Sequence, residues 1–230
     1  MANVKHLIFS LIAAATLPAA CASAQDFFDT SVSDEVFALG VRTGLNTSVS
    51  TTSKEAGYNI YNKDSWGLGY DLGVVANINI REYISLQPGF FFESRSSDFT
   101  YVRDAQIGAA QPEWNINIGH TRRYTFQIPI LASVHFNLGS DVKWNVEFGP
   151  YVAFNLKTDS DNTYFQSNEM KPLDLRHKSA DFGFKMGTGF TVLDHYVVAV
   201  HYLAGCCDAW KDPVRGGKNK AWTFTIGYDF

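Results

Sequence analysis

Ionisable residues recur at alternate positions of segments whose other residues are bulky and apolar, and these are the residues that could do chemistry. The basic members are Arg42, Arg95, Arg123, Lys143 and Lys185, and the acidic members are Asp71, Glu93, Glu147, Asp181 and Asp229. Five positive charges are therefore matched by five negative ones. Buried charges must be paired, so this balance predicts salt bridges and hydrogen bonds across a shared polar interior.

Two histidines, His135 and His201, fall on or near the same polar side as these charges. Each could act with a carboxylate as a general acid or base. No spacing in the sequence fixes a triad of nucleophile, histidine and acid around either of them. We therefore interpret both histidines as members of the polar network and include His201 among its predicted residues. We predict no catalytic residues.

A cluster of oxygen-bearing residues, Asp159, Asp161 and Asn162, has the composition of a calcium-binding loop. An EF-hand loop that begins at Asp159 would need glycine at its sixth position and glutamate at its twelfth, where Tyr164 and Met170 stand. A solvated loop explains the cluster better. We predict no metal and no other cofactor.

The residues with chemistry must be positioned by strands, and the sequence from Trp222 to Phe230 is the clearest of them. Aromatic and aliphatic residues take every second position there, and small or polar residues lie between them. This period of two indicates a strand with an apolar medium on one face. Seven similar runs precede it and begin at Phe37, Leu68, Ile84, Tyr124, Trp144, Phe182 and Tyr196.

The connections between these runs alternate in length along the chain. Tight turns are expected at 81–83, 139–141 and 193–195, and long polar loops at 47–66, 96–122, 157–179 and 205–219. An even strand number with short turns at one rim and long loops at the other is typical of outer-membrane barrels. We therefore predict an all-β fold: an eight-stranded antiparallel transmembrane up-and-down β-barrel with short periplasmic turns and four long extracellular loops.

The two faces of the predicted strands differ in a way that selects a membrane barrel over a soluble one. The bulky faces of eight strands could not all fit inside an eight-stranded barrel, whose interior is just filled by side chains. The bulky face should therefore meet lipid, and the face with glycines and charges should line the lumen. A lumen this narrow is predicted to be plugged by its charged network, since wide pores need about 16–18 strands.

The first 24 residues have the features of a secretory signal peptide. Lys5 precedes an apolar core, and Ala22-Ser23-Ala24 is a small-residue cleavage site, so we predict cleavage after Ala24. Lipidation at Cys21 is the alternative, but Pro18 stands where a lipobox normally has leucine. Residues 25–35 are predicted to form a short, loosely held segment and 36–230 the barrel domain. The mild formal charge of −4 gives no indication of a nucleic-acid partner.

Two adjacent cysteines, Cys206 and Cys207, remain once the leader is removed. Neighbouring cysteines can form only a strained vicinal disulfide, so no disulfide framework is expected. They are either two thiols or one unusual bridge.

Four motifs resemble the PorT-like outer-membrane β-barrel family of Bacteroidota, often described as porin family proteins. Tyr83-Ile-Ser-Leu-Gln-Pro, Ile128-Pro-Ile-Leu, Glu147-Phe-Gly-Pro-Tyr and Asp181-Phe-Gly-Phe-Lys are similar to that family's strand motifs, in the same order. The resemblance spans about residues 37–230 and implies the barrel fold. It implies no catalytic residues, and one branch of the family is associated with a secretion and gliding apparatus.

The expected function is that of a non-enzymatic integral outer-membrane barrel that is structural or presents its loops to an extracellular or secretion-system partner. The alternatives are a small-solute channel and a barrel enzyme that modifies outer-leaflet lipid. Outer-membrane lipid and the barrel-assembly machinery are the other expected partners. Phe230 resembles the aromatic C-terminal signal by which barrels are recognised for insertion.

Overall fold

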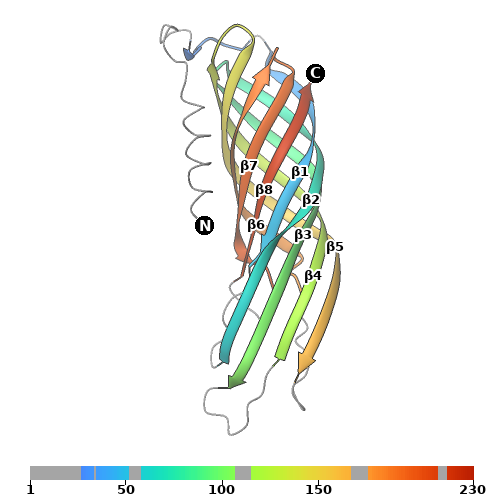
Figure 1. Cartoon of the computed structure of the whole chain (residues 1–230). Coiled ribbons are helices and arrows are strands. Elements are labelled where there is room, and N and C mark those ends of the chain that lie inside the picture. The colour runs from blue at the N-terminus through green and yellow to red at the C-terminus, as the bar shows by residue number, and fades with distance from the viewer. Residues whose placement is uncertain (1–26, 34, 52–57, 107–114, 167–175, 212–216) are drawn as a thin grey trace.

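The computed structural model describes residues 27–33, 35–51, 58–106, 115–166, 176–211 and 217–230. The predicted signal peptide and its cleavage site lie outside these residues. Eight antiparallel strands close into a barrel in chain order (Figure 1). They are β1 (Phe37–Ser50), β2 (Tyr58–Arg81), β3 (Ile84–Gln106), β4 (Asn115–Asn137), β5 (Val142–Gln166), β6 (Ala180–Val192), β7 (Tyr196–Asp208) and β8 (Lys218–Asp229).

The last strand closes the sheet on the first one, as the sequence predicts. The β1–β8 pairing runs from Gly40 opposite Asp229 to Ser50 opposite Asn219. The backbone N–H of Phe230 donates to the carbonyl of Leu39 at 2.8 Å, which extends this seam by one residue. Closure removes the free edges that an open sheet would expose to lipid.

The alternation of residue types in each strand becomes an alternation of environment. On β8 the outward side chains of Phe224 and Ile226 are 58% and 59% exposed, whereas Thr223 and Thr225 between them are 2% and 4% exposed. The ring thus has an apolar outer surface and a polar interior. Lipid covers such a surface at no cost, so the predicted assignment of faces to lipid and lumen agrees with the structure.

Three tight turns connect the strands at one end of the ring, which we call the turn end. The β6–β7 turn has two consecutive residues with positive φ, Leu193 (53°) and Asp194 (59°). Positive φ at both central residues is a requirement of the type I′ turn, which suits the right-handed twist of a hairpin. His195 closes the turn by donating its N–H to the carbonyl of Val192 at 3.2 Å.

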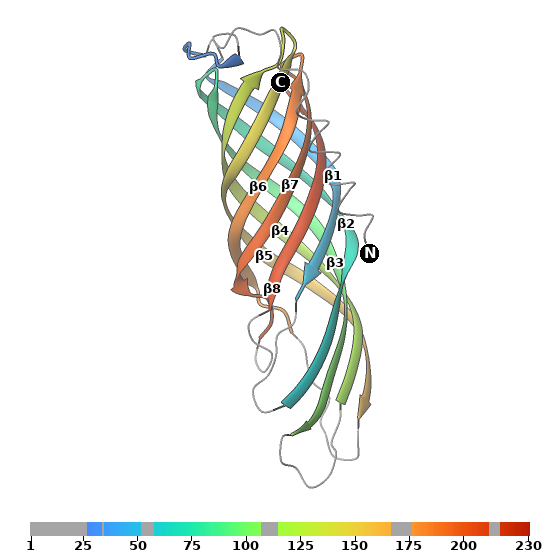
Figure 2. The same cartoon turned by 60° about the vertical axis from the view of Figure 1, so that its left-hand side comes forward.

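The opposite end, the loop end, differs from the prediction. Most of the polar residues expected in three long loops continue as strands, and β2 to β5 run well beyond the ring (Figure 2). We call this part the projecting sheet: residues 58–66, 96–106, 115–122 and 157–166. The prediction of loops was wrong there because polar side chains above the lipid no longer show an apolar stripe, although the backbone keeps pairing. The β3–β4 register continues without a shift from Ile84–Val134 to Arg103–Asn115.

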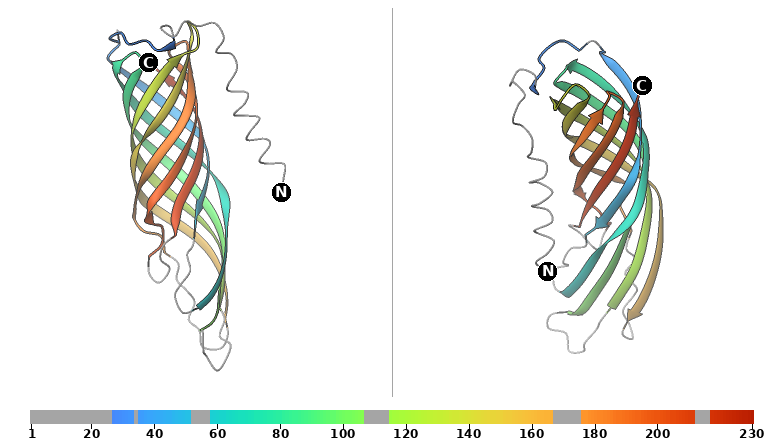
Figure 3. Two further views of the ribbon diagram at one scale, coloured as in Figure 1. Left: turned by 90° about the vertical axis from the view of Figure 1, so that its left-hand side faces the viewer. Right: turned by 45° about the horizontal axis from the view of Figure 1, so that its top comes forward.

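The N-terminal segment lies across the rim at the turn end (Figure 3). Phe28 packs against Tyr83 with ring centroids 4.6 Å apart, and Phe27 stacks on Phe136 at 5.1 Å. The carbonyl of Ser31 accepts from the N–H of Glu82 at 3.3 Å. The segment expected to be loosely held is therefore attached to the β2–β3 turn and to β4. No helix among the described residues has the length and apolar character needed to cross a membrane.

Candidate functional site

The lumen contains three successive layers from the turn end to the loop end. The first is a polar cavity, the second is a layer of buried charges, and the third is an aromatic cluster. We call them the vestibule, the plug and the lid, and define each by its residues below.

The vestibule is a cavity of about 640 Å³ at the turn end. Its wall includes residues of the N-terminal segment, among them Asp29 and Ser33, and residues of several strands. The ionisable side chains that line it are Asp29, Glu35, Glu82, Glu147, Asp194 and Asp229 with Arg42, Arg81 and Lys143, besides His135. Six carboxylates against three cations favour neutral or cationic guests over anions.

One wall of the vestibule holds a chain of three side chains centred on His135. Its Nε2 lies 2.8 Å from Ser85 Oγ, and its Nδ1 lies 2.8 Å from Asn145 Oδ1. Asn145 Nδ2 in turn donates to Thr191 Oγ1 at 2.7 Å. A carboxylate partner for His135 was one possibility considered from the sequence, and the structure places a serine and an amide beside it.

The plug contains two close ion pairs and one close histidine–carboxylate contact. Arg42 Nη1 lies 2.7 Å from Asp229 Oδ1, and Arg95 Nη2 lies 2.5 Å from Glu93 Oε2. His201 Nε2 lies 2.5 Å from Glu147 Oε2. Arg42 and Asp229 belong to neighbouring strands, and Glu93 and Arg95 to the same strand, so these two pairs are local and do not cross the barrel.

Hydrogen bonds between a charged and a neutral side chain make the other connections in the plug. Arg123 on β4 donates from Nη2 to Ser50 Oγ on β1 at 2.8 Å. Asp181 Oδ2 on β6 accepts from Tyr151 on β5 and from Asn219 on β8, each at 3.1 Å. Lys185 Nζ lies 4.6 Å from the centre of the Phe91 ring.

The remaining two charges of the predicted network differ from the others. Asp71 lies directly opposite Glu93 in the β2–β3 pairing, and in the described part of the chain its Oδ1 accepts no hydrogen bond. Lys143 lies at the rim, 2.9 Å from Asp194 and 3.4 Å from Glu82, with its side chain 30% exposed. Lys143 lies near the start of β5, beside two turns, and so does not belong to the plug.

The plug closes the middle of the barrel to water. Nine of the ten predicted network charges, all except Lys143, are at most 8% exposed. Gln127, Tyr151 and Thr125 fill the same level and are at most 1% exposed. With its amide oriented to satisfy both neighbours, Gln127 donates to Glu93 and accepts from Arg95. Side chains this inaccessible leave no room for a water-filled path beside them.

The lid consists of Phe99 and Tyr101 on the inner face of the projecting sheet, together with Ala209, Trp210 and His177. The His177 and Trp210 rings stack with centroids 3.9 Å apart, and Trp210 Nε1 donates to the carbonyl of Thr51 at 2.9 Å. Burial lowers the pKa of His177 well below its usual value, and the nearby Arg123 charge adds to this. The lid covers the plug from the loop end.

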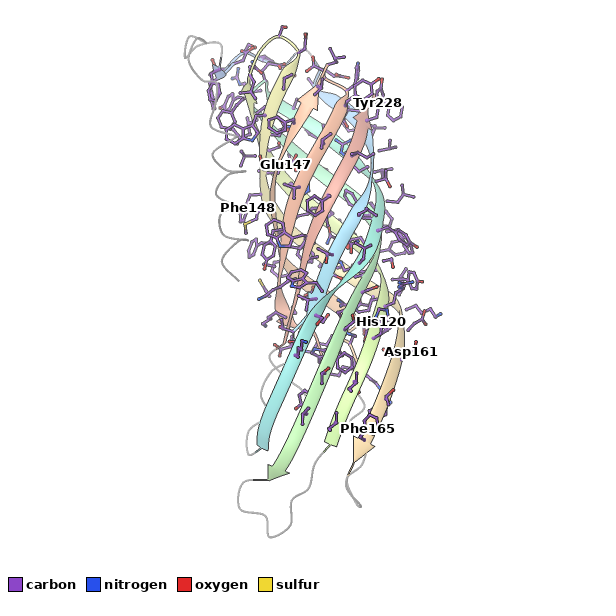
Figure 4. The ribbon with its side chains drawn as sticks, in the orientation of Figure 1. His120, Glu147, Phe148, Asp161, Phe165 and Tyr228 are labelled. Atoms are coloured by element: carbon purple, nitrogen blue, oxygen red, sulfur yellow. The ribbon has the colours of Figure 1, made fainter. Side chains whose placement is uncertain are left out.

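The outer face of the projecting sheet carries the side chains that the sequence assigned to loops (Figure 4). His120 pairs with Asp98 on β3 at 2.5 Å and lies opposite Asp161 on β5, while Arg122 lies opposite Asp159. Asp159 and Asp161 are exposed, as a solvated site requires. In the described part of the chain, no three His, Cys, Asp or Glu side chains could together hold a metal ion.

Three further residues named from the sequence lie at the two ends of the barrel. Cys206 is exposed and Cys207 half-buried near the loop end of β7, and both are free thiols. Phe230 is exposed beside Tyr228 at the turn end, with ring centroids 5.2 Å apart.

Sequence reasoning missed Ser85 and Asn145, although both lie at inward positions of predicted strands. A rule that pairs inward hydroxyl, imidazole and amide groups on adjacent strands would have found them, because Ser85, His135 and Asn145 lie on β3, β4 and β5. The contacts within the lid could not be read from the sequence, because the lid residues on the projecting sheet and on the segments near 177 and 210 lie more than 30 residues apart.

Comparison with known proteins identifies the class of barrel. No curated protein matches the chain. Among solved structures it is similar to Ail of Yersinia pestis (14% identity, TM-score 0.40, 85% of this chain and 100% of Ail). It is also similar to neisserial surface protein A (11%, 0.43, 84% and 97%) and to OprG of Pseudomonas aeruginosa (9%, 0.45, 88% and 98%). Similarity at this level carries no information about ligands.

A family model described as "Outer membrane protein beta-barrel domain" matches residues 24–206, which is most of the chain. The match agrees with the closed ring, its apolar outer surface and its polar interior. In such barrels the short turns face the periplasm and the longer extensions face outward. The turn end is accordingly the periplasmic end, and the chain belongs to the outer membrane protein beta-barrel domain family.

Proposed function

We propose that this protein is a closed, structural outer-membrane barrel whose main role, the presentation of its projecting sheet to an extracellular partner, requires no catalysis. The observation that carries the proposal is the continuation of β2 to β5 beyond the ring as a paired sheet. A paired sheet holds its outward side chains at fixed spacing, as recognition of a partner requires. Flexible loops would not fix them in this way.

The charges on the outer face support recognition of a polar partner. Asp98, His120 and Asp161 form one row across β3, β4 and β5, and Arg122 and Asp159 lie in the next. Alternating charges of this kind give orientation and association rate more than affinity. Ile118 lies among these charges and is 46% exposed, so the outer face also presents an apolar side chain.

The two alternatives from the sequence are not favoured. A small-solute channel needs a wet path, whereas the plug side chains are almost inaccessible. A lipid-modifying enzyme of the outer leaflet needs a nucleophile beside a histidine at the loop end. There, among the described residues, His120 pairs with Asp98 and His177 stacks on Trp210.

The finer assignments are part of the same proposal. The motifs on β3 to β6 support a place in the PorT-like branch of the family, and with it an extracellular or secretion-system partner. Outer-membrane lipid contacts the bulky outer face of the ring. The barrel-assembly machinery recognises the aromatic residue Phe230.

Photo-crosslinking in living cells tests the proposal. A benzoylphenylalanine at Ile118, on the outer face of the projecting sheet, should give one defined protein adduct. The adduct should disappear when Asp98, Asp159 and Asp161 are all changed to lysine. The same probe at Ile128, on the lipid face of the same strand, is the matched control and should give no protein adduct.

Two results would contradict the proposal. One is the absence of any adduct at Ile118 at normal surface levels of the protein. The other is the appearance of discrete conductance steps when the purified barrel is placed in a planar bilayer.

A further inference from the structure

We propose that Ser85, His135 and Asn145 form an acyl-transfer site that hydrolyses small carboxylic esters entering the vestibule from the periplasm. This activity goes beyond the proposed function and depends on no part of the projecting sheet. It rests on the geometry of three side chains and on the cavity that they line.

The hydrogen bonds define the protonation state of His135. Asn145 Oδ1 can only accept, so His135 Nδ1, 2.8 Å away, carries the proton. Nε2 then presents its lone pair to Ser85 Oγ, 2.8 Å away, and the hydroxyl donates to it. Nucleophile, base and orienting group thus stand in the order and at the distances of a catalytic triad, in which an amide can replace the acid.

The three groups are held by rigid elements. In the β4–β5 ladder His135 pairs with Asn145, and in the β3–β4 ladder Ser85 pairs with Ser133, two residues before His135. The backbone N–H of His135 donates to the carbonyl of Tyr83 at 2.8 Å. Asn145 Nδ2 donates to Thr191 Oγ1, which fixes the amide with its oxygen toward the imidazole.

The surroundings suit a neutral or cationic ester. Ser85, His135 and Asn145 all line the 640 Å³ vestibule, and the excess of carboxylates there disfavours anionic substrates. Ser85 itself is 2% exposed, so the acyl group must be small to reach its Oγ. The amide of Asn77 and the ammonium of Lys143 line the same cavity and are the candidate donors to a developing oxyanion.

The reaction needs no reagent besides water. Ser85 Oγ bonds to the ester carbon while its proton passes to His135 Nε2. The bond to the leaving alcohol then breaks, and the alkoxide takes that proton. Water next adds to the acyl-serine, with His135 as base, and releases the carboxylic acid and free Ser85. Asn145 does not contact the substrate and is a positioning residue.

The test uses the full-length barrel folded in detergent micelles and a small alkyl fluorophosphonate, which phosphonylates activated serines with loss of fluoride. We expect stoichiometric labelling, located on Ser85 by peptide mass spectrometry, and none after heat unfolding. Hydrolysis of 4-nitrophenyl acetate should fall at least about 100-fold in both Ser85→Ala and His135→Gln, because a general base contributes about 10²–10⁴-fold.

Matched variants separate catalysis from a purely structural hydrogen-bond chain. Ser133→Ala removes the cross-strand neighbour of Ser85, which does not line the vestibule, and should leave labelling unchanged. Asn145→Ala should lower the hydrolysis rate and Asn145→Asp should restore it, although both lose the amide bond to Thr191. Each variant is first shown to be folded by its faster migration on unboiled gels.

Three results would overturn the proposal. Folded wild-type protein that stays unlabelled has no activated serine. A label located on any residue except Ser85 places the reactivity elsewhere. Equal hydrolysis by wild type and Ser85→Ala shows that these side chains are structural.

Discussion

Within the ring, β3 turns Phe90 outward to lipid and Glu93 inward to the lumen. In the projecting sheet the same strand turns Asp98 outward and Tyr101 inward. The β3–β4 register does not shift between the two regions, so the backbone keeps the same faces throughout. Where β3 leaves the ring, a carboxylate takes the outward place and a buried aromatic side chain takes the inward place.

This reversal shows that the surrounding medium, and not the sheet, decides which side chains a face can carry. In lipid a charged outward side chain costs about 2–4 kcal/mol at the midplane, whereas in water it costs almost nothing. Inside the ring the narrow lumen can hold charges because they pair, as Glu93 does with Arg95. Above the ring the inner face needs an apolar cover, and Trp210 packs on Phe99 to provide it.

The largest difference between the regions should appear when assembly itself is disturbed. Deletion of Phe230 removes a backbone bond at the β1–β8 seam and the proposed insertion signal. We expect a severalfold loss of assembled barrel, measured as the heat-modifiable form in outer-membrane fractions. Phe165→Ala, which removes an exposed aromatic from the projecting sheet, is the control and should leave the level normal. Equal levels in the two variants would contradict the proposed role of Phe230.

The second-largest difference should be the loss of stability when a charged side chain is removed from each region. Arg95→Met leaves Glu93 buried without its ion pair and should lower the free energy of unfolding by about 3–5 kcal/mol. Arg122→Met removes an exposed arginine on the outer face of the projecting sheet and should cost about 1 kcal/mol or less. Urea unfolding in phospholipid vesicles measures both. A similar cost for both substitutions would mean that the plug is solvated.

The stability of the lid should depend on pH. Burial lowers the pKa of His177 in the folded lid, so below the unfolded value of about 6.5 the opened lid binds more protons than the closed one. The stability of the lid is therefore complete above pH 6.5. It should fall by about 1.4 kcal/mol per pH unit below that value, until the folded pKa is reached.

Hydrogen exchange of residues 176–179 and 209–211 measures this opening. The charged side chain near His177 is Arg123, which stays positive between pH 5 and 7. The pH dependence of lid opening therefore follows the titration of the imidazole. His177→Phe keeps the stacking on Trp210 and should make the protection factors of these segments, which are corrected for the intrinsic exchange rate, independent of pH between 5 and 7. If the wild-type protection factors are no lower at pH 5 than at pH 7, the imidazole is not excluded from water.

The ring was predictable from the sequence, because lipid imposes one continuous signal on it. The apolar alternation from Leu68 to Ile80 and from Trp222 to Phe230 marks outward positions directly. The inward charges follow from the same period. The match of β8 to β1 was predictable because a barrel must close.

The projecting sheet and the vestibule wall were not predictable for a different physical reason. At Arg122 and Asp159 the apolar alternation ends although pairing continues, so the sequence there has the composition of a loop. The triad depends on which inward residues meet diagonally, and that is set by the registers of β3, β4 and β5. One residue of slip would separate Ser85 from His135, and no local pattern encodes that register.

The reversal of the two faces can be tested with one residue type on one strand. Ile128 and Ile118 both point outward from β4 and are 36% and 46% exposed, but the first lies in the ring and the second in the projecting sheet. In vesicles, Ile128→Arg should lower the free energy of unfolding by about 2–4 kcal/mol. Ile118→Arg should change it by less than about 0.5 kcal/mol. Equal losses in the two variants would contradict the account, because both positions would then lie in the same medium.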